Sequence, residues 1–166
     1  MIEEFKARAI EHLQENLPRI ETCLCQLSEA EIWQRPNPAS NSIGNLIVHL
    51  CGNVEQYILA SLAGEPDTRT RDAEFGARGG LNHEELLRRI TDTVERACAV
   101  IARQDEASLM QKRHVQAFHK TGVGVVMHVV EHFTYHVGQI AFWTKALKNQ
   151  DLGFYADLDL NQKNEA

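Results

Sequence analysis

The chain has 166 residues, of which 43% are hydrophobic and 24% are charged, and its 17 basic and 23 acidic side chains give a formal net charge of −6. A chain of this length and composition is typical of one globular domain that folds without disulfides or a structural metal. Its acidic balance and the absence of a basic cluster argue against a nucleic-acid partner and against an anionic membrane surface. We therefore expect a single domain, residues 1–166, that acts on a small-molecule substrate.

The ends of the chain and its cysteines indicate a cytoplasmic protein. No stretch approaches 18 consecutive apolar residues, and Glu3 and Glu4 stand where a signal peptide would be basic. The sequence has no CxxC pair, so we expect reduced, buried thiols that behave as small hydrophobic side chains. The four cysteines are Cys23, Cys25, Cys51 and Cys98.

The first predicted helix covers about residues 3–27. Its apolar residues recur every three or four positions, which is the pattern of one helix face against a core. They are Ile10, Leu13, Leu17, Ile20, Leu24 and Leu27. Pro18 lies inside this pattern, and because proline lacks an amide hydrogen we expect it to kink the helix or divide it.

A short turn and a second long helix follow. Ser28 and Glu31 have the spacing of a capping box, which predicts a short helical turn before the two prolines of the next loop. Asn41 or Ser42 can cap the second helix, whose apolar face continues until Gly64 ends it.

Two further helices complete the pattern. Asn82 and Glu85 supply the capping box of a third helix that extends to about Arg103. Thr121 is the candidate cap of a fourth helix that reaches about Lys148. We find no strand pattern, so the sequence predicts an all-α fold of four long helices.

The connection between the second and third helices predicts their relative direction. Residues 63–81 form a longer segment than a simple helical hairpin needs, and a segment of this length can cross the domain lengthwise. The third helix should then run parallel to the second. We therefore predict a four-helix bundle of up-down-down-up topology with a long crossover between helices two and three.

Histidines carry the clearest chemical signal. His128, His132 and His136 are spaced by four residues and should form one stripe on the fourth helix, while His49 interrupts an apolar run on the second. Two imidazoles at this spacing can chelate one divalent ion, and a third from another helix leaves open coordination positions. An unpaired buried imidazole is costly, so His49 requires a partner.

Two motifs resemble the DinB/YfiT-like family, the damage-inducible helical proteins rather than the DNA polymerase. They are NSIGNLIVHLCGN at 41–53 and VEHFTYHVGQI at 130–140, and the loop RTRDAEF at 69–75 resembles one subgroup of unassigned function. The resemblance covers essentially the whole chain. It implies an up-down-down-up bundle and a divalent metal held by His49, His132 and His136, with zinc or nickel as first choices and iron or manganese as further ones.

Several neighbouring residues could support these ligands. A metal-bound histidine usually forms a hydrogen bond through its other ring nitrogen, which Asn53, Glu131, Tyr135 or Gln139 could provide, although each could equally fill a local polar gap or face solvent. Tyr135 and Gln139 are also the weak catalytic candidates. We expect His128, one turn from His132, to be a supporting or core residue rather than a ligand.

The expected chemistry follows from a Lewis-acidic metal, which can activate water for hydrolysis or a thiol for addition to an electrophile. Members of the resembling family include transferases and isomerases that use low-molecular-weight thiols, which favours thiol transfer. The alternatives are a metal-dependent hydrolase and a non-enzymatic metal-binding or stress-related protein. Family resemblance and the frequency of two-fold oligomers predict a homodimer. Arg69 and Arg71 could hold an anionic substrate, but ion pairing with Asp72 or Glu74 is the favoured role.

Overall fold

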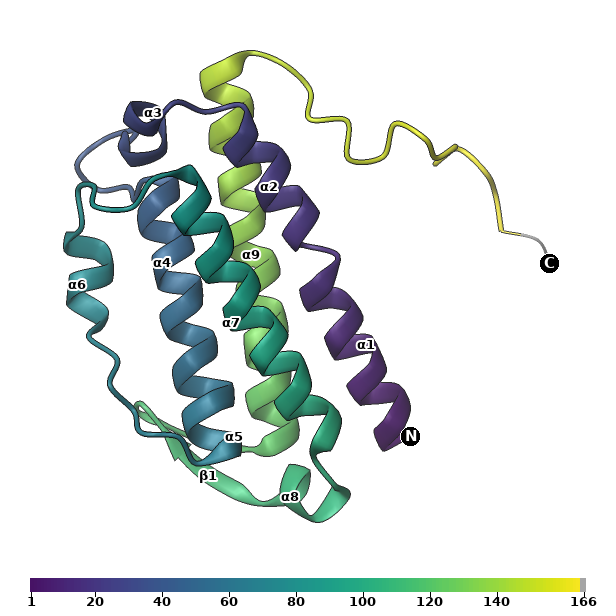
Figure 1. Ribbon diagram of the computed structural model, residues 1–166. Coiled ribbons are helices and arrows are strands. Elements are labelled where there is room, and N and C mark those ends of the chain that lie inside the picture. The colour runs from purple at the N-terminus through teal and green to yellow at the C-terminus, as the bar shows by residue number, and fades with distance from the viewer. Residues whose placement is uncertain (165–166) are drawn as a thin grey trace.

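The computed structural model describes residues 1–164 and is mainly helical (Figure 1). Its helices are α1 (Ile2–Gln14), α2 (Leu17–Cys25), α3 (Glu29–Trp33), α4 (Ile43–Val54), the π-helical segment η1 (Glu55–Ala60), α5 (Ser61–Ala63), α6 (Arg71–Gly76), α7 (His83–Arg103), α8 (Glu106–Met110) and α9 (Gly122–Lys148). Its two strands are β1 (Lys112–Val115) and β2 (Phe118–Thr121). Four long helical stretches lie side by side: α1 with α2, α4 with η1 and α5, α7, and α9.

Proline divides the first stretch. Helix α1 ends at Gln14 and α2 begins at Leu17, with Pro18 in the first turn of α2, where a missing amide hydrogen costs least. The prediction that Pro18 kinks or divides this helix is confirmed.

Side-chain caps begin four of the helices at the predicted positions. Each capping oxygen accepts a hydrogen bond from the backbone amide three residues later, which satisfies a donor that the helix leaves free. These caps are Ser28 for α3, Ser42 for α4, Asn82 for α7 and Thr121 for α9. The predicted ends of the third and fourth helices are confirmed as well.

The second stretch contains a π-helical turn that sequence analysis did not predict. Helix α4 continues through η1 into α5, and Gly64 ends it in the left-handed conformation with φ of 76°. By length and composition, Ile43–Ala63 is a weak candidate membrane span, but 67% of its most apolar window is buried against the rest of the chain. This burial is what a helix at the centre of a domain requires.

The crossover between the second and third stretches contains an unpredicted helix, α6. It packs against α4. Figure 1 shows that α4, which precedes this connection in the chain, and α7, which follows it, run in the same direction. Buried Asn45 fixes α6, because its Nδ2 donates to the carbonyl oxygens of Glu74 and Ala77, each at 2.9 Å. The first turn of α4 therefore sets the position of α6.

The expectation of a strand-free chain is wrong at one place. Strands β1 and β2 form an antiparallel hairpin in which His114 faces His119, and the short helix α8 precedes it. Gln116 occupies the hairpin turn with φ of 53°, a conformation that glycine or asparagine adopts more readily. The turn lacks those residues, so the hairpin was missed.

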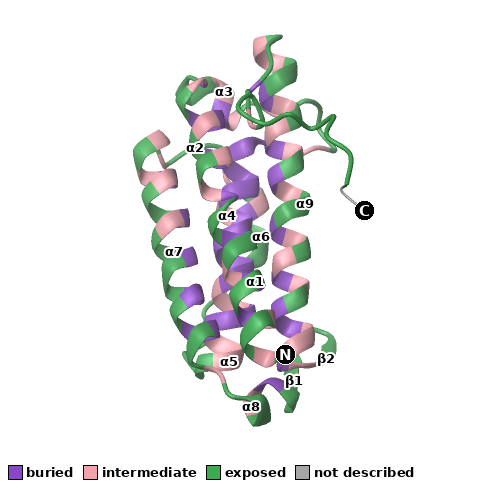
Figure 2. Cartoon of the chain, turned by 90° about the vertical axis from the view of Figure 1, so that its right-hand side faces the viewer, coloured by how far each residue is buried: buried purple, intermediate pink, exposed green. Residues whose placement is uncertain are grey.

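The core lies between the four stretches, whose buried residues face inward in Figure 2. Tyr57 and Phe133 are its largest fully buried side chains. All four cysteines are free, and the prediction of buried thiols holds for three of them. Cys25 is exposed, because it points away from the face of α2 that carries Cys23 and Leu24 into the core.

Candidate metal centre

Three histidines from two helices meet at one point. His49 projects from α4, and His132 and His136 project from successive turns of α9. The Nε2 atom of His132 lies 3.1 Å from Nε2 of His49 and 3.2 Å from Nε2 of His136. One ligand atom from each residue therefore lies within 4.8 Å of the other two, in the only such cluster among the described residues.

A buried carboxylate orients His49. Nδ1 of His49 donates to Oε2 of Glu74 at 2.8 Å, so the Nε2 lone pair of His49 points toward the other two histidines. Arg69 holds the same carboxylate from the other side, with Nε 2.7 Å from Oε1 and Nη2 2.9 Å from Oε2. Histidine, glutamate and arginine are all buried at this point, with side-chain exposures of 3–7%.

Gln139 plays the corresponding role for His136. Its Oε1 accepts a hydrogen bond from Nδ1 of His136 at 2.7 Å, which again leaves the Nε2 lone pair facing the cluster. Two lone pairs are then directed at Nε2 of His132, which carries at most one hydrogen and can donate to only one of them. Protein atoms alone leave the cluster one donor short.

A divalent cation fits this donor set. Zinc binds imidazole nitrogens at about 2.0–2.1 Å in tetrahedral geometry, which puts two such ligands about 3.3 Å apart. The two Nε2 separations of 3.1 and 3.2 Å are close to that value. A cation would accept the Nε2 lone pairs of all three histidines. The other ring nitrogen of His132, Nδ1, is buried without a partner among the described residues.

The cluster favours neutral imidazoles. Burial, together with the adjacent charges of protonated His136 and His49, lowers the pKa of His132 to about 3. Burial also lowers the pKa of His136, although its bond to Gln139 acts in the opposite direction. Neutral imidazole is the form that binds metal ions.

Glu74 is held in its charged form. Burial acts to raise the pKa of its carboxyl, but the hydrogen bonds from Arg69 and His49 outweigh burial and bring the pKa below its ordinary value. Gly52 makes room for this ion pair: a Cβ atom there would lie 2.0 Å from Oε1 of Glu74 and 3.1 Å from Nε of Arg69. Any larger residue would displace the carboxylate.

The remaining predicted site residues lie around the cluster in different ways. His128 stacks on buried Tyr57 at 4.3 Å between ring centroids and lies 5.5 Å from the ring of His132. Asn53 is buried one turn after His49, with its Oδ1 unpaired among the described residues. The rings of Tyr135 and His136 form a T-shaped pair with 5.1 Å between their centroids, and Glu131 is exposed.

Sequence analysis missed the partner of His49. It treated Glu74 as an ion-pair partner that fixes the crossover, which the structure does show for Arg69, but it gave the carboxylate no part in the histidine cluster. Arg71 instead lies over the ring of Phe75, 4.8 Å from its centroid. The one available signal was a run of charged residues in a segment that had no predicted helix.

Comparison with known proteins shows the family. A model described as "Protein of unknown function (DUF1572)" matches residues 1–156. The chain belongs to this DinB-like family. No functionally curated protein matches it.

Solved structures share the DinB-like fold. A conserved protein from Enterococcus faecalis has a TM-score of 0.75 at 16% identity, and the match covers 87% of this chain and 97% of that protein. The DinB-like protein YjoA from Bacillus subtilis has a TM-score of 0.66 at 13% identity, with coverages of 87% and 94%. A DinB-like protein from Bacillus cereus has a TM-score of 0.66 at 11% identity, and the match covers 84% of this chain and 91% of that protein. Identities this low show similarity of fold alone, and the predicted resemblance to DinB-like proteins is confirmed.

Proposed function

We propose that this DinB-like protein binds one divalent metal ion through His49, His132 and His136 and uses it to transform a small molecule. The observation that carries the proposal is the convergence of three Nε2 atoms, two of them held by Glu74 and Gln139 with their lone pairs facing the third. Orienting hydrogen bonds of this kind accompany histidine ligands in metalloproteins.

The number of protein ligands favours catalysis over a structural metal. Structural zinc sites are closed by four protein ligands, whereas catalytic sites have three and leave a position for substrate or water. The cluster has three histidines among the described residues, and His132 and His136 are only partly buried. A bound metal would act as a Lewis acid that stabilises the anionic form of a ligand in the open position.

The chain's own residues prepare the site before any ligand arrives. Glu74 keeps His49 in the tautomer that has a free Nε2, and Arg69 keeps Glu74 ionised. Gln139 fixes the tautomer of His136. Because Asn45 anchors α6 to α4, the carboxylate is held in place by the backbone as well.

Within this class we propose transfer of a low-molecular-weight thiol to an electrophile. The support is the resemblance of the two histidine motifs to a family that includes thiol-dependent transferases, together with a set of only three histidine ligands, which would leave a bound metal a position for a thiol sulfur. Zinc and nickel suit three imidazoles, and iron or manganese are further options. Metal-dependent hydrolysis and a non-enzymatic metal-binding role are the competing proposals.

The arrangement of the helices supports the proposed site. We propose that the four stretches form an up-down-down-up four-helix bundle, because they lie side by side and α4 and α7 are parallel. In that arrangement α4 and α9 are neighbours, and each supplies ligands from its middle turns. The crossover then brings Glu74 to the outer side of His49.

Elemental analysis and a thiol screen test this proposal. Protein purified without added metal should contain one divalent ion per chain, and the loaded protein should accelerate addition of some small thiols to electrophiles. A chelator and the His136→Ala variant should each abolish that acceleration. Stoichiometric metal with equal rates for wild type and His136→Ala would leave the non-enzymatic role as the better account.

A further inference from the structure

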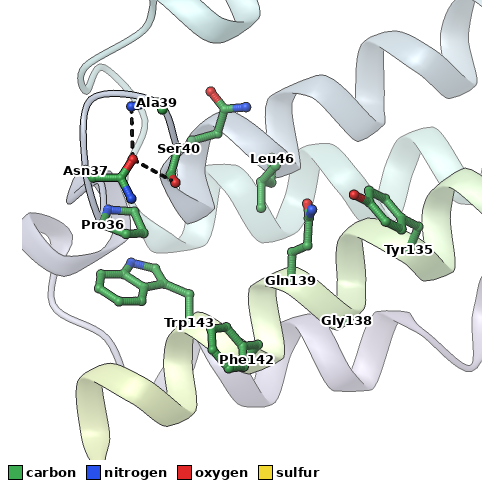
Figure 3. A pocket seen from close by; sticks show the side chains of 11 residues that line it. Pro36, Asn37, Ala39, Ser40, Leu46, Tyr135, Gly138, Gln139, Phe142 and Trp143 are labelled. Atoms are coloured by element: carbon green, nitrogen blue, oxygen red, sulfur yellow. Dashed lines mark hydrogen bonds between the residues drawn. The ribbon is translucent and has the colours of Figure 1, made fainter.

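A cavity of about 600 Å³ lies beside the histidine cluster. It is open to solvent on one side and is bordered by the loop at residues 36–41, by Leu46 of α4 and by α9, as Figure 3 shows. Pockets that bind small molecules usually have volumes of about 300–1,000 Å³. The space therefore fits a small molecule better than a helix or strand of another protein.

Aromatic rings and uncharged polar groups line the cavity. Tyr135, Phe142 and Trp143 contribute rings from α9, and Figure 3 shows them along one side of the space. Tyr135 is 64% exposed and Phe142 is 73% exposed. Exposure of two large rings beside one cavity is unfavourable in water and is typical of binding sites.

Among the described residues, no charged side chain lines the cavity. Its polar groups are the amides of Asn37, Asn41 and Gln139, with the hydroxyls of Ser40 and Tyr135. The lining itself therefore offers no cationic side chain to pair with an anionic ligand. The lining therefore suits an uncharged ligand with an aromatic body and a few hydrogen-bonding groups.

Three lining residues connect the cavity to the histidine cluster. Gln139 accepts the hydrogen bond from Nδ1 of His136, and the ring of Tyr135 forms a T-shaped pair with the same imidazole. Leu46 lies one helical turn before His49 on α4. A ligand in the cavity would thus contact two residues, Tyr135 and Gln139, that themselves contact His136.

We propose that this cavity binds the uncharged aromatic part of the substrate whose reaction takes place at the histidine cluster. The inference rests on the proposed function for the reaction, but binding of the aromatic part itself requires no metal. It assigns specificity to Phe142 and Trp143, which have no contact with the three histidines among the described interactions.

Two fluorescent probes that differ in one charged group provide the test. N-phenyl-1-naphthylamine is uncharged, and 8-anilinonaphthalene-1-sulfonate has the same rings with a sulfonate. Full-length protein, metal-loaded and EDTA-treated, is titrated with each probe, and metal content is measured on the same samples. We expect saturable binding of one uncharged probe per chain, at least tenfold tighter than the sulfonate and unchanged within twofold by EDTA.

Variants locate the probe. Phe142→Ala should weaken binding of the uncharged probe at least tenfold, and Gly138→Leu should do the same, because Gly138 lines the cavity and a Cβ atom there would meet no atom within 4 Å. Phe118→Ala is the matched control, since Phe118 is 50% exposed and lies on the distant hairpin. Metal content should be unchanged in all three variants.

The outcomes separate the cavity from the metal. Binding with these variant effects supports the cavity even if the protein holds no metal, in which case only the proposed function fails. Absence of saturable binding, equal affinity for the sulfonate, loss of binding on EDTA treatment, or equal weakening by Phe118→Ala would each overturn the inference.

Discussion

The carboxylate of Glu74 accepts a 2.8 Å hydrogen bond from Nδ1 of His49, although the two residues are 25 positions apart and lie on different helices. This bond determines which nitrogen of His49 faces His132. Replacing Glu74 with glutamine removes the charge that fixes the tautomer and leaves Arg69 without its ion-pair partner. We expect Glu74→Gln to weaken divalent metal binding about 10–100-fold, as is usual when such an outer hydrogen-bond partner is lost.

The control for this change is Glu131→Gln. Glu131 directly precedes His132 but is exposed, so loss of its charge should leave metal affinity within about twofold. Competition with a chromogenic chelator measures both affinities. Equal effects of the two substitutions would show that overall charge, rather than the bond to His49, governs binding.

Gly52 should be as important as Glu74, for steric reasons. In Gly52→Ala the new Cβ would lie 2.0 Å from Oε1 of Glu74, so the ion pair with Arg69 must shift. We expect a loss of about 1–3 kcal/mol in the free energy of unfolding, as overpacking typically costs, and weaker metal binding. Urea denaturation of metal-free and metal-loaded protein measures both effects.

Gly138→Ala on α9 is the matched control for Gly52→Ala on α4. A Cβ atom at Gly138 meets no atom within 4 Å, so alanine should stabilise α9 by about 0.5–1 kcal/mol through its higher helix propensity. If Gly52→Ala also stabilised the protein, the packing around Glu74 would be looser than the structure indicates.

The histidine cluster should make the metal-free protein sensitive to acid. Burial and the neighbouring histidine charges lower the pKa of His132 from 6.5 to about 3, so between these values the unfolded chain binds a proton that the folded chain does not. Stability therefore falls as the pH drops from about 6.5 toward 3. In EDTA-treated His132→Leu this contribution is absent, and the urea midpoint should change less with pH than in wild type. Parallel pH profiles for the two proteins would refute the expectation.

The predicted homodimer stays a prediction that light scattering can test. We expect a mass of about twice 18.8 kDa at working concentrations. A mass near 18.8 kDa across the concentration range would show a monomer.

Local signals in the sequence were sufficient for the long helices. Ser42, Asn82 and Thr121 mark helix starts through their own side-chain oxygens, and apolar spacing marks the buried faces. The hairpin lacks such signals, because Gln116 occupies a turn position where Asn or Gly would have indicated a strand reversal. The π-helical segment η1 contacts both α7 and α9, and no local sequence pattern marks it.

The candidate site divides in the same way. His132 and His136 share a helix face by spacing alone, His49 is marked by its position in an apolar run, and the family resemblance joins the three as one ligand set. The bond from His49 to Glu74 depends on how α6 lies against α4, and that placement comes from Asn45 donating to two carbonyl oxygens. Long-range contacts of this kind cannot be read from residue spacing.

Metal stoichiometry in matched histidine variants tests the central claim most directly. His132→Ala removes the nitrogen at the centre of the cluster, whereas His114→Ala removes an exposed imidazole of the hairpin that lies near the ring of His119. Elemental analysis after purification without added metal should give one divalent ion per chain for wild type and His114→Ala and none for His132→Ala, with all three proteins folded by circular dichroism. One ion per chain in folded His132→Ala, or none in wild type after incubation with zinc or nickel and removal of the excess, would contradict the three-histidine site.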